Sequence, residues 1–331
     1  MAIQTRRGFL GLIFGAMALA ALLLPASAQE RVTILLDYAF PEGIHAPLHL
    51  ATVKGWYKDA GLDVEIKDGK GSVVTVQQIA AGQADIGLSQ LPTVATAISN
   101  GLPVISIMAY NRTSDNGLVV GRDSGISTLA DFKGKKLGAV AGGATVPFIE
   151  PFLKAGGLAL SDVQMVVVDG SALTSTYTSG GVDGIITIAG YFIPTVEKTL
   201  PSKAILFSDV GIKLPGYGLL VNKDTLSKRP DVLRKIVEIN QRAWAYIAAG
   251  HEVEGADAIV SQRASLQPDR ESLIAQVKFY SKLLESPATK GKPLGWQSDS
   301  DWKDALRVMA NAGVVKPDLN TADMFTNQFI K

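Results

Sequence analysis

The stretch GQADIGLSQ (residues 82–90) returns in altered form as GGVDGIITI (residues 180–188). Each copy places an aspartate, Asp85 or Asp183, directly before a short apolar run. A repeat period of about 100 residues is too long for a solenoid and has the size of a lobe. The repeat therefore predicts two similar lobes within one chain.

Strand-like and helix-like segments alternate around both copies of this repeat. The predicted strands of the first run are Val32–Leu36, Val64–Lys67, Ile86–Leu88, Val104–Met108 and Leu118–Val120. Those of the second run are Leu137–Val140, Met165–Val168 and Ile185–Ile188. Alternation of this kind predicts an α/β fold with largely parallel sheets.

Amphipathic helices replace this alternation in the last third of the chain. A strand at Gly218–Val221 returns the chain to the first lobe, and the helices after it complete that lobe's core. They are predicted at Pro230–Ala249, Arg270–Leu284, Ser300–Asn311 and Ala322–Phe329. We expect lobe I to comprise residues 29–120 and 217–331, and lobe II residues 121–216. The cleft between the lobes is the expected binding site, because α/β sheets bind ligands beyond the carboxyl ends of their strands.

Composition excludes several classes of function. The chain has 331 residues, of which 47% are hydrophobic, and its 32 Lys and Arg nearly balance its 31 Asp and Glu. This balance argues against a nucleic-acid-binding surface. The chain contains no cysteine. Disulfides, thiolate nucleophiles, cysteine-held metal sites and a lipidated N-terminal cysteine are therefore excluded.

The N-terminus has the form of an export signal, predicted over residues 1–28. A basic segment, Met1–Arg7, precedes the apolar run Gly8–Leu24, and a small-residue cleavage site ends at Ala28. Thr5–Leu10 is similar to a twin-arginine signal, with an ordinary secretory signal as the alternative. We expect cleavage after Ala28 and a periplasmic location.

Three stretches carry a resemblance to a known family. They are DYAFPEGIHAP (residues 37–47), KGWYKDAGLDV (54–64) and AAGQADIG (80–87). The chain resembles the periplasmic solute-binding proteins of ABC importers, in the branch similar to the thiamine pyrimidine-precursor synthase. Relatives of this branch bind alkanesulfonates, taurine, nitrate and riboflavin.

The resemblance implies a two-lobe, Venus-flytrap fold of the type II kind. It implies a monomer without a cofactor that closes on a small molecule and docks on an inner-membrane permease with its ATPase. A flat, pyrimidine-precursor-like heteroaromatic solute is the expected ligand; a sulfonate, taurine, nitrate or other small anion is the alternative. A signalling subunit would differ only in its partner.

An enzyme is the alternative of another class. The related synthase carries a Cys-rich motif and a histidine that supplies part of its product. This chain has no cysteine, and His45 lies only approximately where that histidine would be. No nucleophile beside a base is evident in the sequence either. We therefore expect a binding protein without catalytic residues.

Aromatic and polar side chains at strand ends are the first candidates for ligand contact. Tyr38, Phe40 and Tyr191 could stack on a flat ring, and Asp37 or Asn111 could bind its nitrogen atoms. Ordinary packing is the alternative for the aromatic residues.

Helix N-termini supply the second group, because they present free N–H groups to a ligand. These candidates are Ser72, Ser89, Gln90, Gly143, Thr145 and Thr187. Helix capping is the alternative for Ser72, and a plain tight turn for the loop with Gly143 and Thr145.

Two histidines, His45 and His49, stand four residues apart. A metal site is not favoured, because Pro47 starts the helix after His45 and no third ligand is evident. We expect His45 to be a neutral hydrogen-bond donor in the cleft.

Overall fold

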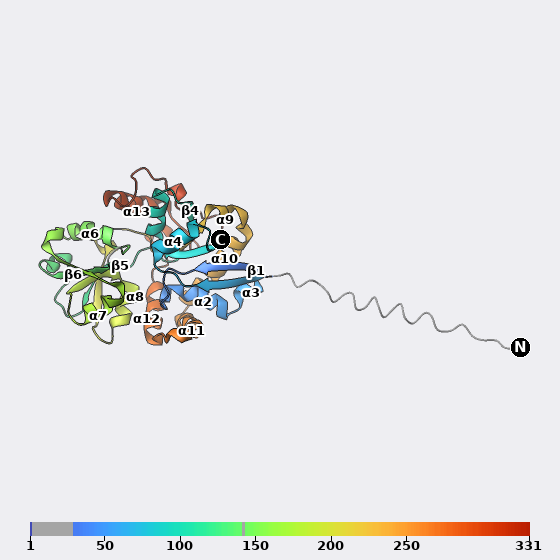
Figure 1. Ribbon diagram of the computed structural model, residues 1–331, viewed down its shortest axis with the longest axis horizontal. Helices are drawn as coiled ribbons and strands as arrows, with labels where there is room; N and C mark the ends of the chain where they lie inside the picture. The colour runs from blue at the N-terminus through green and yellow to red at the C-terminus, as the bar shows by residue number, and fades with distance from the viewer. Residues whose placement is uncertain (2–28, 141–142) are drawn as a thin grey trace.

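Two five-stranded sheets form the framework of the protein (Figure 1). The computed structural model describes Met1, residues 29–140 and residues 143–331. The first sheet has the strand order β2-β1-β3-β10-β4 and the second the order β7-β6-β8-β5-β9. The strands are β1 (Glu30–Leu35), β2 (Leu62–Lys67), β3 (Ile86–Gln90), β4 (Val104–Ala109), β5 (Asn116–Gly121), β6 (Lys136–Val140), β7 (Gln164–Val168), β8 (Gly184–Ile188), β9 (Ser202–Leu206) and β10 (Tyr217–Asn222).

The two sheets share one topology. In each, the strand that opens the repeat lies between two parallel neighbours, β1 between β2 and β3, and β6 between β7 and β8. In each, an antiparallel strand, β10 or β5, follows in the sheet order. The predicted α/β class with two lobes is confirmed, and the repeat extends to the order of the strands.

The antiparallel strand of each sheet is the one that arrives by a crossing between lobes. β5 pairs with β8 and β9, so Asn116 is the first residue along the chain that belongs to the second sheet. The prediction had placed residues up to 120 in lobe I, and this placement is corrected. The pairing partner of a strand is set by tertiary contacts, which the local pattern of β5 does not encode. β10 returns to the first sheet between β3 and β4.

Helices cover both sheets. The α-helices are α2 (Ala46–Val53), α3 (Trp56–Asp59), α4 (Ser72–Ala80), α5 (Leu91–Ser99), α6 (Ile149–Ala155), α7 (Leu173–Thr178), α8 (Ala189–Val196), α9 (Lys223–Lys228), α10 (Pro230–Ala248), α11 (Glu252–Gln262), α12 (Arg270–Tyr280) and α13 (Asp299–Asn311). Short 3₁₀ turns precede α2 and α6, namely η2 (Gly43–His45) and η4 (Val146–Phe148). Helix α12 lies between the lobes, against α8 of the second (Figure 1).

The C-terminal segment differs from the prediction. The helix expected at Ala322–Phe329 is absent; a single 3₁₀ turn, η10 (Thr321–Asp323), takes its place. Phe325 then forms a parallel bridge with Ser106 at the edge strand β4. Hydrogen bonds to a sheet edge satisfy the backbone here, so the apolar spacing of the segment does not lead to a helix. Helices α9 and α11 and strand β9 were not predicted.

The core of the first lobe depends on the late helices. Trp244 of α10 and Ile259 of α11 are fully buried in the same apolar cluster as Val32 and Ile34 of β1. The first lobe therefore completes its core only after the chain has passed through the second sheet and supplied α10 and α11. This return is the second crossing between the lobes.

The predicted export signal lies outside the described residues, apart from Met1. In the part of the chain that the structure describes, no helix has the length and apolarity needed to span a membrane.

Candidate functional site

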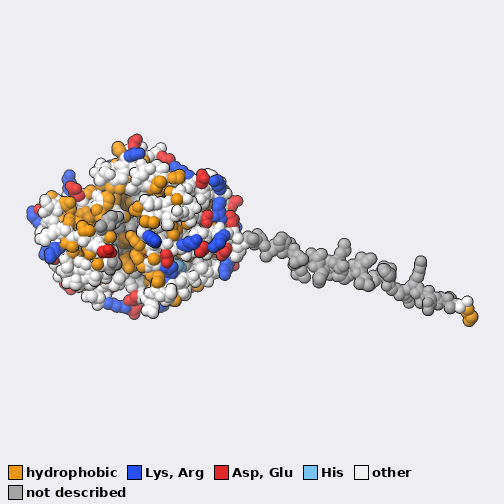
Figure 2. All heavy atoms as spheres, in the orientation of Figure 1, with side chains coloured by type: hydrophobic (Ala, Val, Ile, Leu, Met, Phe, Trp, Pro, Cys, Tyr) orange, Lys and Arg blue, Asp and Glu red, His pale blue; other side chains and the backbone are white. Residues whose placement is uncertain are grey.

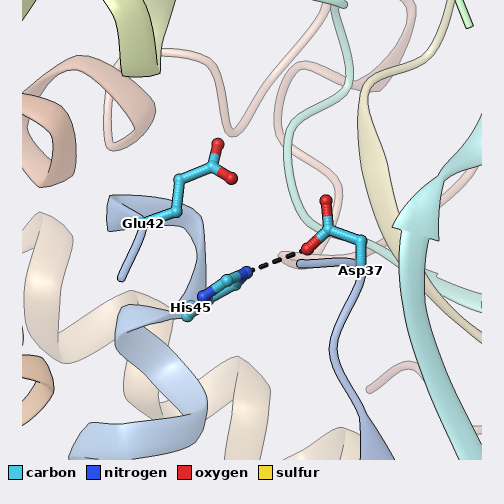
Figure 3. A group of neighbouring side chains, drawn as sticks. All are labelled: Asp37, Glu42 and His45. Atoms are coloured by element: carbon cyan, nitrogen blue, oxygen red, sulfur yellow. Dashed lines mark hydrogen bonds and ion pairs between the residues drawn. The ribbon is translucent and has the colours of Figure 1, made fainter. Parts of the chain in front are cut away.

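The carboxyl end of β1 leads into a loop that carries the first site residues and is buried at both ends, at Asp37 and Glu42. Asp37 follows β1 and is fully buried, and its carbonyl accepts a hydrogen bond of 2.6 Å from the N–H of Gly71. Asp37 Oδ1 lies 2.9 Å from Nε2 of His45, which is also buried (Figure 3). Both residues were predicted to lie in the cleft, and the structure brings them together.

Glu42 contributes a second buried carboxyl group, at the residue before η2. The hydroxyl of Tyr280 donates to Glu42 Oε1 at 2.7 Å, and the N–H of Gly43 donates to Gln276 Oε1 at 2.8 Å. These bonds hold the loop against α12. Burial, and then the nearby carboxylate of Asp37, raise the pKa of Glu42 well above its usual range, although the bond from Tyr280 opposes the shift. The protonated form of Glu42 is therefore favoured.

Three buried polar atoms beside these groups have no hydrogen-bond partner among the described residues. They are Asp37 Oδ2, Glu42 Oε2 and the hydroxyl oxygen of Tyr217. Buried polar groups are nearly always hydrogen bonded, and an unpaired one costs about 1–3 kcal/mol. These atoms therefore mark a place where the polar groups of a bound molecule would be stabilised.

The same cluster has the donor types of a small-cation site. One ligand atom each from Asp37, Glu42 and His45 lies within 4.8 Å of the others. In the structure, however, His45 Nε2 is paired with Asp37. The rings of His45 and His49 lie 6.5 Å apart with their planes tilted by 60°, and both ring nitrogens of His49 lack a described partner. The group could thus accept a small cation or the polar edge of an organic molecule.

A third buried carboxyl group, Asp115, comes from the first crossing between the lobes. Its Oδ2 accepts a hydrogen bond of 3.0 Å from the N–H of Gly190, in the first turn of α8. Burial raises the pKa of Asp115 to about 6, against the lowering effect of its hydrogen bonds. Asp115 therefore joins the crossing to the helix that carries Tyr191.

The three predicted aromatic residues form a continuous set of rings. Tyr38 and Phe40 stack with ring centroids 4.8 Å apart and an interplanar angle of 23°. Phe40 also lies 4.7 Å from Tyr191, which comes from the second lobe. Burial raises the pKa of Tyr191 to about 12, so its ring stays a neutral phenol. The rings thus form a direct contact between the two lobes.

The predicted polar residues at the end of β3 form a local network. The N–H of Gln90 donates to Ser72 Oγ at 3.2 Å, and the hydroxyls of Ser89 and Thr93 lie 2.8 Å apart. Gln90 Oε1 accepts a bond of 3.0 Å from Asn116, which begins β5 of the second sheet. Ser72 is not the cap of α4, because that position belongs to Gly71. Within this network, Gln90 links the two lobes.

Asn111 has a structural role at the two crossings. Its Oδ1 accepts a bond of 2.6 Å from the N–H of Tyr217, and its Nδ2 donates to the carbonyl of Thr113 at 3.0 Å. The amide thus joins the segment that leaves the first lobe, before β5, to the segment that returns to it at β10. Thr187 is half-buried in β8, where it pairs with Gly117 of β5.

The predicted loop of lobe II borders a groove of about 200 Å³. Gly143 lines this groove with apolar residues of both lobes, among them Val73, Pro92 and Phe148. Thr145 is buried at the start of η4. Figure 2 shows hydrophobic side chains gathered along the middle of this face, over both lobes.

Several site residues were missed in the sequence. Glu42 lies within the stretch that carries the resemblance, so its position beside Gly43 and His45 offered a signal. Asp115 and Tyr280 offered none, because only the packing of the crossing and of α12 brings them to the loop.

Two α/β lobes joined by two crossings, with polar groups buried between them, define the periplasmic-binding-protein class of fold. A solved member is the alkanesulfonate-binding protein SsuA from Xanthomonas axonopodis pv. citri bound to MOPS. It superposes with a TM-score of 0.67 over 91% of this chain and 99% of that protein, at 12% identity. At this identity the likeness establishes the fold.

Within this class, the chain belongs to the NMT1/THI5-like family, whose model matches residues 43–252. The chain is 26% identical over 285 residues to the formylaminopyrimidine-binding protein of Halalkalibacterium halodurans, covering 84% of each chain. It is also 26% identical over 235 residues to the 4-amino-5-hydroxymethyl-2-methylpyrimidine phosphate synthase THI13 of Saccharomyces cerevisiae, covering 67% of this chain and 68% of the synthase. The resemblance inferred from the sequence is confirmed at the level of the family.

Proposed function

We propose that this chain is the exported, periplasmic solute-binding subunit of an ABC importer. In this role it captures a flat, pyrimidine-precursor-like heteroaromatic solute in the interlobe cleft and delivers it to a membrane permease with its ATPase. The formylaminopyrimidine-binding relative supports the ligand class. The predicted signal over residues 1–28 supports export.

One observation carries the choice of ligand: unpaired polar atoms lie buried beside the aromatic rings. Asp37 Oδ2 is an acceptor, and Glu42 Oε2 is a donor in the favoured protonated form. An aminopyrimidine edge presents an N–H donor beside a ring-nitrogen acceptor, so it matches this pair of groups. The rings of Tyr38, Phe40 and Tyr191 suit the flat faces of such a molecule.

The same atoms disfavour a small anion. A sulfonate or nitrate offers acceptors only, so it would leave Asp37 Oδ2 unpaired. Asp37 and Asp115 would also repel a negative charge in a buried site. A sulfonate or nitrate is therefore a less favoured ligand than an aminopyrimidine.

Binding without turnover is the second part of the proposal. The homologous synthase in yeast keeps an enzyme as the competing hypothesis. The chain has no cysteine, so the Cys-rich motif expected of that synthase has no counterpart here.

Thermal unfolding of the purified protein with candidate ligands tests the function. The ligands are 4-amino-5-hydroxymethyl-2-methylpyrimidine, its formylamino counterpart, taurine, an alkanesulfonate and nitrate, each with and without a chelator. A true ligand at 100 times its Kd adds about 2.7 kcal/mol to the free energy of unfolding. We expect stabilisation by the pyrimidines, unchanged by the chelator. Stabilisation by an anion alone contradicts the ligand class, and conversion of a pyrimidine substrate contradicts binding without turnover.

A further inference from the structure

Arg263 lies outside the cleft yet contacts the loop that carries two of its aromatic rings. The residue follows α11, and its side chain is 15% exposed. Its Nη2 donates to the carbonyl of Ala39 at 2.6 Å and lies 2.6 Å from Asp68 Oδ1. One guanidinium nitrogen thus joins three segments: the end of α11, the loop after β1 and the loop after β2.

Ala39 occupies a special position, because it separates the stacked rings of Tyr38 and Phe40. The orientation of its peptide groups fixes the direction in which the two rings leave the backbone. Among the described residues, the bond from Arg263 is the one hydrogen bond made by the main chain of residues 38–41. The backbone of this segment is therefore held by Arg263 at its centre.

Asp68 strengthens the same arrangement. It pairs with Arg263, and its loop also holds the other end of the aromatic segment, since the N–H of Gly71 donates to the carbonyl of Asp37. A charge-assisted bond from a guanidinium is among the stronger hydrogen bonds in proteins. The Arg263 side chain is 15% exposed and that of Asp68 is 46% exposed, so solvent partly screens the charges of this pair.

We propose that Arg263 is a positioning residue for solute binding, which holds the Tyr38–Phe40 segment in the conformation that presents its rings to the cleft. The expected effect of Arg263 on the affinity for a solute rests on the proposed function. The contact between Arg263 and the loop does not depend on any ligand. Arg263 acts through Ala39 and does not touch the solute. Arg263 and Ala39 are 224 positions apart in the sequence.

The first test measures the loop without ligand. The full chain, exported and purified from the periplasm, is treated with chymotrypsin under native conditions, and cleavage after Tyr38 is followed. We expect cleavage at this bond about tenfold faster in Arg263→Ala than in wild type, because local opening exposes the segment. A few millimolar guanidinium should slow it again. Arg242→Ala is the matched control, since Arg242 stacks on Trp56 in the same lobe at 3.9 Å.

The second test measures affinity for 4-amino-5-hydroxymethyl-2-methylpyrimidine. We expect about tenfold weaker binding in Arg263→Ala and recovery of most of it in Arg263→Lys, which keeps a charged donor for Ala39 and Asp68. Arg263→Gln replaces the alanine variant if that variant does not fold.

Unchanged cleavage after Tyr38 in the folded Arg263 variant overturns the positioning role, whatever the affinity. General loss of thermal stability without faster cleavage at this bond overturns it as well. Failure of the wild type to bind any pyrimidine contradicts the proposed function instead, while the cleavage experiment still decides the role of Arg263.

Discussion

The ring of Phe40 lies 4.7 Å from the ring of Tyr191, centroid to centroid, with an interplanar angle of 36°. Phe40 follows the first strand of one sheet, and Tyr191 lies in the first turn of α8 above the other. This contact exists only because the two lobes face each other. It brings aromatic rings of both lobes together, and Tyr38 extends the set. These are the rings that a flat solute would meet in the proposed site.

Removing one of these rings should weaken binding of a flat solute. We expect Tyr191→Ala to reduce the affinity for an aminopyrimidine about tenfold, because stacking and the buried ring area are both lost. Titration calorimetry measures the change. Phe325→Ala is a matched control, since Phe325 is a half-buried ring stacked on Trp302, near α13. Equal losses in the two variants would contradict the role of Tyr191 in the cleft.

The two carboxyl groups should respond differently to amide substitution. Asp37→Asn should weaken binding of an aminopyrimidine by about 10- to 100-fold, because a charge-assisted bond is lost. The raised pKa of Glu42 favours the protonated carboxyl group, which an amide resembles, so Glu42→Gln should weaken binding less than Asp37→Asn does. If Glu42→Gln proved as harmful as Asp37→Asn, the assignment of the proton to Glu42 would be wrong.

Stability should depend on pH through Asp115. Burial raises its pKa to about 6 from the ordinary 3.8, so the folded state binds this proton more tightly than the unfolded state. The contribution of this proton to the free energy of unfolding is fully present below pH 3.8 and is lost as the pH rises through 6. Asp115→Asn does not titrate. Between pH 3.5 and 7, the variant should therefore gain about 3 kcal/mol in free energy of unfolding relative to wild type. Urea unfolding at several pH values measures this, and a constant difference between the two proteins would refute it.

His49 should contribute in the opposite direction. Burial, and then the charges of His45 and Arg263, lower the pKa of His49 to about 3 from 6.5. The unfolded state thus binds its proton more readily, and the stability present above pH 6.5 is lost as the pH falls toward 3. We expect His49→Leu to lose less stability than wild type between pH 7 and 4 in urea unfolding. An equal loss of stability in the two proteins between these pH values would contradict the burial of a neutral His49.

A methyl group at Gly190 should disturb both packing and binding. A Cβ atom there would lie 2.6 Å from Phe279 Cδ1 and 2.8 Å from Asp115 Oδ2. We expect Gly190→Ala to lower the free energy of unfolding by about 1–3 kcal/mol, because α8 must move away from α12. Tyr191 moves with α8, so affinity should fall too. Gly121→Ala, where a Cβ atom would meet only ordinary contacts at 3.7 Å or more, should change neither quantity appreciably.

Much of the candidate site was predictable, because one short stretch carries it. Asp37, Tyr38, Phe40 and His45 lie between the end of β1 and the start of α2, so a strand-end argument predicts all four for the cleft. Asn111 was predicted by the same argument, yet its amide binds the backbone of the two crossings. A strand-end position fixes where a side chain lies, and the neighbouring chain decides what it contacts.

The sequence by itself determined the α/β class and the repeated lobe, because both are set by local periodicity and by a repeat of about 100 residues. Only the tertiary structure decided that β5 belongs to the second sheet and that Tyr280 and Arg263 reach the loop after β1. The pairing of β5 and the packing of α11 and α12 depend on contacts between distant segments. No local pattern encodes such contacts, because each is selected by the burial that the whole chain achieves.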